Sequence, residues 1–153
     1  MKHLLIVCNT PSENTRLLAQ QCVAGAEDTD IDAVTTLFKT PLEATADDVI
    51  RADGIIIGTT ENFGAMSGLI KDFFERIYYP CLEIKQGLPY ALYIRAGLDG
   101  TGTQVGVEKI ITGLRWREIH APVLLKGDYT DHFAAQTREL GLYMAAGLDN
   151  GIF

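Results

Sequence analysis

The sequence lacks several features that would assign a protein to a class at once. Its unbroken apolar runs have the length of a β-strand and fall far short of the roughly 20 residues that span a bilayer. The opening Met1-Lys2-His3 is followed by only a short apolar run, so no secretory signal is predicted. We therefore expect a cytoplasmic protein without a membrane partner.

Cysteines and basic residues are also scarce. The three cysteines form no C-x-x-C pair, and none has a histidine at zinc-ligand spacing, so neither a disulfide framework nor a metal site is predicted. Lysine and arginine total 13 against 20 aspartate and glutamate residues, which gives a formal charge of -7. An acidic surface without basic clusters repels phosphate backbones and argues against a nucleic-acid partner.

What is present is an ordinary globular composition. The chain has 153 residues, 47% of them apolar, and contains no internal repeat, low-complexity tract or linker. We therefore predict a single domain that spans residues 1–153. Short apolar runs of strand length alternate with segments whose apolar residues recur at helical spacing. The runs cover residues 4–8, 33–38, 54–58, 90–94 and 119–125.

Five helical patterns lie between or after these runs. The first begins near Asn14, and the second starts at Thr45 and Asp48, which are spaced as a capping box. The others are amphipathic segments over residues 69–77, 107–114 and 133–144, of which the first is expected to end at Tyr78-Tyr79-Pro80. Alternation with strands that are apolar on both faces indicates a parallel sheet covered on both sides. The predicted fold class is α/β, a flavodoxin-like three-layer sandwich with a five-stranded parallel sheet of order 2-1-3-4-5.

Ligands of such open sheets bind outside the carboxyl ends of the strands, near the switch point between strands 1 and 3. The first loop at this edge, residues 10–15, contains three hydroxyls and one carboxamide directly before a helix, and no glycine. The absence of G-x-G-x-x-G excludes the dinucleotide fingerprint of a Rossmann domain. Two interpretations stay open: a phosphate site built from these groups and backbone N–H groups, or ordinary capping of the helix.

This loop resembles the phosphate loop of the flavodoxins, whose pattern is Thr/Ser-x-Thr/Ser-Gly-Asn-Thr/Ser. Thr10, Ser12, Asn14 and Thr15 match the pattern in place. Glu13 stands at the glycine position, and its carboxylate must point to solvent if the loop is to hold a phosphate. The resemblance implies that the loop binds the phosphate of FMN.

The second loop, residues 59–68, resembles the NAD(P)H-dependent FMN reductases and the NAD(P)H:quinone oxidoreductases of the tryptophan-repressor-binding-protein type. Their pattern is Thr-Pro-x-x-Phe-Gly-x-Met-x-Gly followed by Lys-x-Phe-x-Asp/Glu-Arg, and Thr60 replaces the proline here. The resemblance implies that residues 60–64 lie along the isoalloxazine ring, while core packing accounts equally well for Met66. The matching residues are Thr59, Phe63, Gly64, Met66, Gly68, Lys71, Phe73, Glu75 and Arg76.

The third loop follows the fourth strand and contains three glycines within six residues, from Gly97 to Gly102. A glycine-rich loop alone predicts only a turn. By resemblance to the same families, this one wraps the pyrimidine edge of the flavin. Arg95, just before it, is predicted either to lie near the flavin N1 position or to form an ion pair with Asp99.

The resemblance implies an FMN-binding oxidoreductase that takes hydride from NAD(P)H and reduces a quinone, a flavin or a similar acceptor. A flavodoxin that only carries electrons, and a module that binds no flavin, are the alternatives. The predicted partner is a small-molecule electron acceptor or a redox protein; a homodimer or homotetramer is left open, and no catalytic side chain is assigned. The predicted FMN-binding residues are Thr10, Ser12, Glu13, Asn14, Thr15, Thr60, Glu61, Asn62, Phe63, Gly64, Ala96, Gly97, Asp99 and Gly100.

Overall fold

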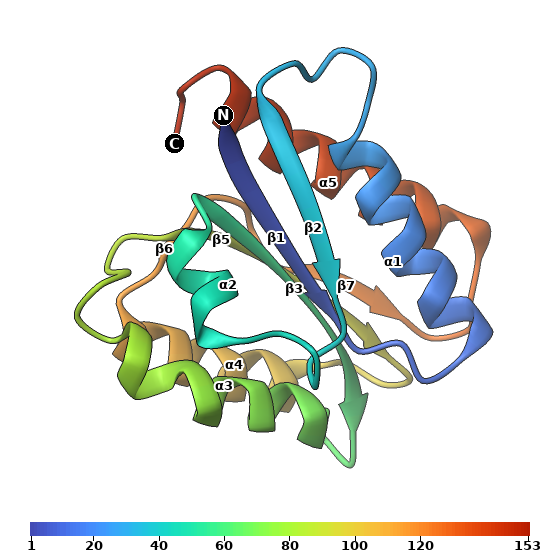
Figure 1. Ribbon diagram of the computed structural model, residues 1–153. Helices are drawn as coiled ribbons and strands as arrows, with labels where there is room; N and C mark the ends of the chain where they lie inside the picture. The colour runs from blue at the N-terminus through green and yellow to red at the C-terminus, as the bar shows by residue number, and fades with distance from the viewer.

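The computed structural model describes residues 1–153 and contains a central sheet between two layers of helices (Figure 1). The longer strands are β1 (Lys2–Cys8), β2 (Val34–Lys39), β3 (Gly54–Asn62), β5 (Pro89–Ala96) and β7 (Val123–Lys126). The short strands are β4 (Ala65–Met66) and β6 (Arg117–Glu118). The helices are α1 (Glu13–Ala26), α2 (Ala46–Arg51), α3 (Gly68–Cys81), α4 (Thr101–Leu114) and α5 (Asp131–Asp149).

The sheet has 7 strands in the order β2-β1-β3-β5-β6, with β4 paired to β3 and β7 paired to β5. The predicted number of five strands was wrong, because β4 and β6 have 2 residues each and are too short to give a recognisable alternation. The five longer strands keep the predicted order, and all pairings among them are parallel. The last predicted strand was too long, since β7 begins only at Val123.

The central strands supply two hydrophobic cores, one on each face of the sheet. Leu5 and Val7 of β1 pack with residues of α2, α3 and α4. Leu4 and Ile6 point to the other face and pack with residues of α1 and α5. The residues of β3 and β5 alternate between the same two cores. Burial on both faces explains why these strands read as continuous apolar runs.

Two predictions about helix ends are confirmed. The capping box at Thr45 and Asp48 starts α2, and α3 ends at Cys81, one residue beyond Pro80. All three cysteines are buried and free, and burial raises the pKa of the Cys8 thiol to about 12. No helix combines the length and the apolar character needed to cross a membrane.

Helices α1 and α5 approach each other closely, and this contact fixes the position of α1. A Cβ atom at Gly141 would lie 1.9 Å from the carbonyl oxygen of Cys22, and one at Gly25 would lie 1.9 Å from that of Arg138. The hydroxyl of Thr137 on α5 donates a hydrogen bond to the carbonyl oxygen of Leu18 at 2.8 Å. The middle and the C-terminal half of α1 are therefore held against α5 by close backbone contacts and this hydrogen bond.

We expect Gly141→Ala to push α1 and α5 apart and to lower the free energy of unfolding by about 1–3 kcal/mol, as overpacking of a close contact does. Gly68→Ala is the control, because a Cβ atom there meets nothing within 4 Å and alanine is the better helix former. Urea titrations of both variants and the wild type measure the difference. An unchanged stability of Gly141→Ala would contradict the close contact.

Candidate functional site

Three loops meet at the carboxyl ends of β1, β3 and β5, at the lower end of the sheet in Figure 1. We name them the first loop (residues 9–15), the hairpin (residues 59–67, which joins β3 to β4 and α3) and the third loop (residues 96–101). Asn9 Nδ2 donates to Thr60 Oγ1 at 3.0 Å and so joins the first loop to the hairpin. The Glu61 carboxylate accepts hydrogen bonds from the backbone N–H groups of Leu98 at 3.3 Å and Gly100 at 2.9 Å. These bonds make the three loops one connected edge.

In the first loop, Ser12 and Thr15 form a capping box at the start of α1. Their hydroxyl oxygens lie 2.9 Å apart, the N–H of Thr15 donates to Ser12 Oγ at 3.2 Å, and the N–H of Ser12 donates to Thr15 Oγ1 at 2.9 Å. The capping interpretation thus describes the bonds that these two side chains make. In both capping bonds the hydroxyl oxygen accepts, so the cap leaves the Ser12 O–H able to donate to a ligand, whereas the Thr15 hydroxyl donates to the Ser12 carbonyl oxygen at 3.0 Å.

Other groups of the first loop keep free donors. The side chains of Thr10 and Asn14 form no hydrogen bond within the protein, and the N–H groups of Glu13 and Asn14 have no backbone acceptor. The first N–H groups of a helix have no intrahelical partner, and together with the helix dipole they favour an anion. The loop therefore presents neutral donors at the N-terminus of a 14-residue helix.

Glu13 is the first residue of α1, its φ is negative, and its side chain is exposed without a hydrogen bond to the loop. The departure from glycine at this position therefore costs no backbone strain. A carboxylate in the first turn of a helix also interacts favourably with the helix dipole. The Glu13 side chain is exposed to solvent, as the phosphate-loop interpretation requires.

The hairpin ends in a two-residue turn, Phe63-Gly64, between the paired residues Asn62 and Ala65. Both turn residues are left-handed, with φ values of 52° and 75°, as in a type I′ hairpin turn. Glycine adopts this conformation without cost, whereas a side chain with a Cβ pays about 1–2 kcal/mol. The Phe63 ring is fully exposed. A strained, exposed aromatic residue next to a polar edge suggests a functional role.

The base of the hairpin is rigidly supported. Thr59 is buried, and its hydroxyl accepts the N–H of Ser67, the N-cap of α3, at 3.2 Å. A Cβ atom at Gly102 of α4 would lie 2.1 Å from the carbonyl oxygen of Gly64, so the turn rests directly on α4. Met66 packs against the core on this face, which agrees with the core-packing account of that residue.

The third loop combines a buried start with an open middle. Ala96 is buried, and its carbonyl oxygen accepts the N–H of Gly127 at 2.9 Å. Gly97 is exposed, and a Cβ atom there would meet nothing within 4 Å. Asp99 Oδ1 accepts the N–H of Thr101, the first residue of α4, at 3.0 Å. The middle of the loop leaves its backbone accessible to a flat ligand.

Arg95 takes a role that neither prediction described. It forms no ion pair with Asp99; its Nη1 donates to the carbonyl oxygens of Ala96 at 2.8 Å and Leu125 at 3.1 Å. The guanidinium carbon lies 5.1 Å from the ring centroid of Phe133 and 6.0 Å from that of Tyr129. The hydrogen bond to Leu125 joins β5 to β7, and the cation–π contact with Phe133 joins β5 to α5. The predicted ion pair with Asp99 was therefore wrong, and a position near the flavin N1 stays a prediction.

One residue of the site was missed in the sequence. Asn9 is only 7% exposed and directly follows the apolar strand β1. A buried carboxamide needs hydrogen-bond partners, and it finds one in Thr60. The sequence does contain a signal for this residue. Asn9 is a polar residue directly after an apolar run, at the end of a strand that is buried on both faces.

Comparison with known proteins relates the chain to flavoproteins. Residues 1–136 match the family model described as NADPH-dependent FMN reductase. A protein named flavodoxin from Aquifex aeolicus (strain VF5) is 28% identical over 114 residues, which cover 74% of this chain and 60% of that protein. The match thus spans less than two thirds of that relative's length.

Solved structures share the fold over nearly the whole chain. A flavodoxin from the domain Archaea has a TM-score of 0.77 at 20% identity, covering 95% of this chain and 97% of that one. The apo form of an NADH:FMN oxidoreductase has a TM-score of 0.75 at 14% identity, covering 96% and 90%. A WrbA-like flavodoxin from Agrobacterium tumefaciens has a TM-score of 0.71 at 16% identity, covering 95% of both chains. The architecture is therefore flavodoxin-like.

The hydrogen bonds of Glu61 join the hairpin to the third loop, and a substitution of Glu61 tests this link. In Glu61→Ala, the N–H groups of Leu98 and Gly100 lose their acceptor, and we expect their hydrogen exchange to accelerate by roughly tenfold or more. Exchange rates measured by NMR test this. Glu75→Ala on the exposed face of α3 is the control, because the Glu75 carboxylate forms an exposed ion pair with Lys71 and no bond to the third loop. Unchanged exchange at both N–H groups in Glu61→Ala would contradict the connection.

Proposed function

Because the chain belongs to the NADPH-dependent FMN reductase family, we propose that it is an oxidoreductase that binds FMN at the edge formed by the three loops. It takes hydride from NADPH or NADH and passes the electrons to a quinone, a flavin or a similar acceptor. The observation that carries the proposal is the set of unpaired donors at the start of α1, next to the strained hairpin. When bound, the flavin supplies the redox chemistry, and the protein supplies binding and orientation.

The first loop holds the phosphate in this proposal. The N–H groups of Glu13 and Asn14, the Asn14 carboxamide and the Thr10 hydroxyl are the donors without partners. Hydrogen bonds to a charged group are each worth about 1.5–3 kcal/mol. Four such donors can hold a phosphate without lysine or arginine, which suits a chain with a formal charge of -7.

The hairpin and the third loop flank the ring in this proposal. Phe63 supplies an exposed aromatic face at the tip, and the open backbone around Gly97 supplies N–H groups and carbonyls for the polar edge. Glu61 holds the two loops at a fixed separation through its bonds to Leu98 and Gly100. No side chain is assigned as a catalytic acid or base, because the redox reaction of a flavin does not require one.

An electron carrier is the second candidate, and the Aquifex aeolicus relative named flavodoxin favours it. Net acidity suits docking to basic redox partners through electrostatic steering. A carrier shares the FMN site but lacks rapid reduction by NADPH. Kinetics with NADPH therefore separates the two candidates.

The phosphate assignment is tested by Asn14→Asp. Because Asp in the first turn of a helix is stabilising, the folded state should be as stable as the wild type or slightly more so. The new carboxylate repels a phosphate, however, and we expect the Kd for FMN to rise at least tenfold. Gln86→Glu adds the same charge in the loop before β5, at the opposite edge of the sheet, and should leave the Kd unchanged. Wild-type affinity in Asn14→Asp would place the phosphate elsewhere.

The reductase assignment is tested by rapid mixing of the FMN-loaded protein with NADPH in the absence of oxygen. We expect loss of the visible flavin absorbance within seconds, followed by recovery when a quinone is added. The control is the same mixture without NADPH. A flavin that stays oxidised would identify the protein as a carrier, and a purified protein that takes up no FMN would favour the flavin-free module.

A further inference from the structure

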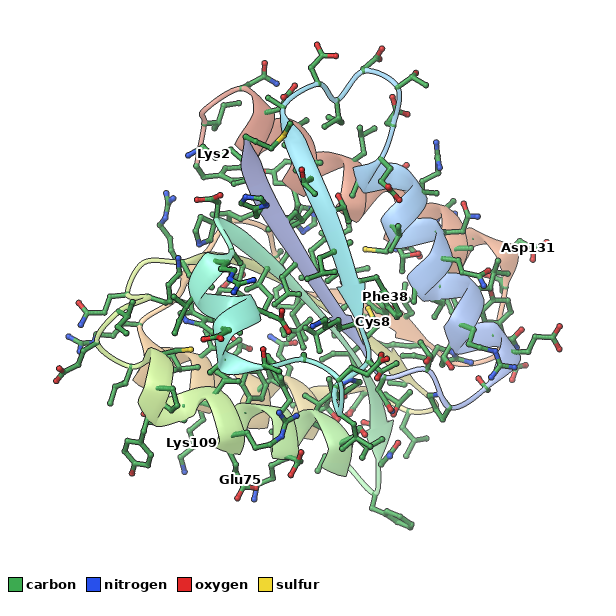
Figure 2. All side chains as sticks on the ribbon, viewed as in Figure 1. Lys2, Cys8, Phe38, Glu75, Lys109 and Asp131 are labelled. Atoms are coloured by element: carbon green, nitrogen blue, oxygen red, sulfur yellow. The ribbon has the colours of Figure 1, made fainter.

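Strand β2 forms one edge of the sheet, because it pairs only with β1. Grooves lie on both of its faces, one of about 360 Å³ between β2 and α1 and one of about 520 Å³ between β2 and α2. Arg16 and Phe38 help to line the first groove, and Leu37 helps to line the second. Leu37 and Phe38 are 43% and 37% exposed, and Figure 2 shows Phe38 near the end of β2, beside Cys8 of β1. The helices therefore leave β2 partly uncovered on both faces.

The register of β2 with β1 determines which backbone groups of β2 are free. The N–H of Lys2 donates to the carbonyl oxygen of Ala33 at 2.9 Å, and Lys2 lies opposite Val34. Alternate residues of a parallel strand direct both of their backbone groups toward the same neighbour. Ala33 and every second residue after it therefore bond to β1, and the residues between them direct their N–H and C=O groups outward. These outward-facing residues are Val34, Thr36 and Phe38.

The outer edge of β2 lacks the features that commonly prevent edge strands from pairing. It contains no proline, and its one charged residue, Lys39, is the last residue of the strand. Strand β7 at the opposite edge is different, because it has 4 residues, follows Pro122 and ends in Lys126. Short length, proline and lysine all discourage the pairing of edge strands. Strand β2 is therefore the edge that is open to another strand.

This edge is complementary to itself in the antiparallel direction. A two-fold axis at Thr36 places Phe38 opposite the partner's Val34, and an aromatic residue opposite a β-branched one is a favourable cross-strand pair. The three outward-facing residues of each copy then exchange about six main-chain hydrogen bonds. On the other face of the sheet, Leu37 lies opposite the partner's Thr35. The same contacts therefore occur twice, as in an isologous interface.

The charges at the two ends of β2 favour the same direction. Asp30 and Asp32 precede the strand and belong to none of the ion pairs of the structure. Lys39 ends the strand and pairs with Asp48 at 2.8 Å, but 30% of its side chain is exposed, and an ammonium group has three donors. Antiparallel pairing places Lys39 next to the partner's Asp32 at each end of the interface. Parallel pairing would instead place the aspartates of both copies side by side.

We propose that β2 is a dimerisation edge, at which a second copy of this chain adds its own β2 in the antiparallel direction to form one continuous sheet. The occupant is a second copy because the pairing of Phe38 with Val34 and of Lys39 with Asp32 is satisfied at both ends only by the chain itself. The first loops of the two copies then lie at opposite ends of the interface, so each copy keeps its own carboxyl edge open. The proposal goes beyond the proposed function and does not depend on it.

Sedimentation equilibrium of the purified chain over the micromolar range tests the dimer, and we expect a monomer–dimer equilibrium. Thr36→Pro removes the outward N–H at the centre of the interface and leaves the bonds to β1 intact, as proline does at a strand edge. We expect its dimer dissociation constant to rise by about tenfold or more. Thr36→Val keeps the N–H and is the matched control. Urea titration of each variant verifies that it is folded.

Cysteine cross-linking tests the register independently of the proline variant. Opposite residues at a non-hydrogen-bonded position have Cα atoms about 4.5 Å apart, which lies within the range of about 4.4–6.8 Å for a disulfide. Under oxidation, we expect a mixture of Thr35→Cys and Leu37→Cys to form a covalent dimer. Each variant alone should form much less of it, because identical residues lie diagonally across the axis, about 7–8 Å apart. The three native cysteines are buried and do not compete.

A chain that stays monomeric over this range would overturn the proposal. A dimer of unchanged affinity in folded Thr36→Pro, or a wild-type dimer whose mixed cysteine variants do not cross-link, would place the contact on another surface and would also overturn it. A dimer that Thr36→Pro weakens and that cross-links preferentially in the mixture would establish the proposed edge. This result would stand whether or not the chain binds FMN.

Discussion

Two-sided burial of β1, β3 and β5 is the constraint on which the rest of the structure depends. Each apolar side chain buried on either face contributes about 1.5–3 kcal/mol, which exceeds the net value of a typical hydrogen bond. Strands that must be covered on both faces occupy the centre of a parallel sheet, with helices returning the chain across each face. All their carboxyl ends then lie at one edge, where Asn9, Thr59 and Thr60 leave the core and begin the polar network of the site.

Some hydrogen-bond donors of this network are paired within the protein, and others have no partner. The donors without a partner are the groups that a ligand at this edge could use. Ser12 and Thr15 bond to each other, and Glu61 takes up two N–H groups of the third loop. Thr10 and Asn14 stay without partners at the start of α1. An acidic chain can hold an anion there because the attraction comes from oriented N–H dipoles rather than from lysine or arginine side chains.

Helix α1 positions the phosphate site that we propose. The close contact with α5 at Gly25 and Gly141 fixes the position of α1. The N-terminus of α1 and the side of α1 that faces β2 therefore stay in the same place relative to the sheet. The flank is open because β2 ends the sheet and has no neighbour on its outer side. One rigid helix can therefore present its N-terminus to an anion and leave a groove along its side, which Arg16 and Phe38 help to line.

The sequence by itself determined the α/β class, the order of the five longer strands, the capping box of α2 and the three loops at the carboxyl edge of the sheet, because apolar periodicity and capping spacings are local properties. It could not determine how polar side chains choose partners far away in the chain. Arg95 was expected to pair with Asp99 or to lie near the flavin N1 position; it forms no ion pair with Asp99, and its guanidinium joins β5 to β7 and α5. The free donors of the first loop, the left-handed Phe63 turn and the groove beside Phe38 were likewise decided only by the tertiary structure. A hydrogen bond, a turn resting on a neighbouring helix and a cavity all depend on distances between elements, and folding alone sets those distances.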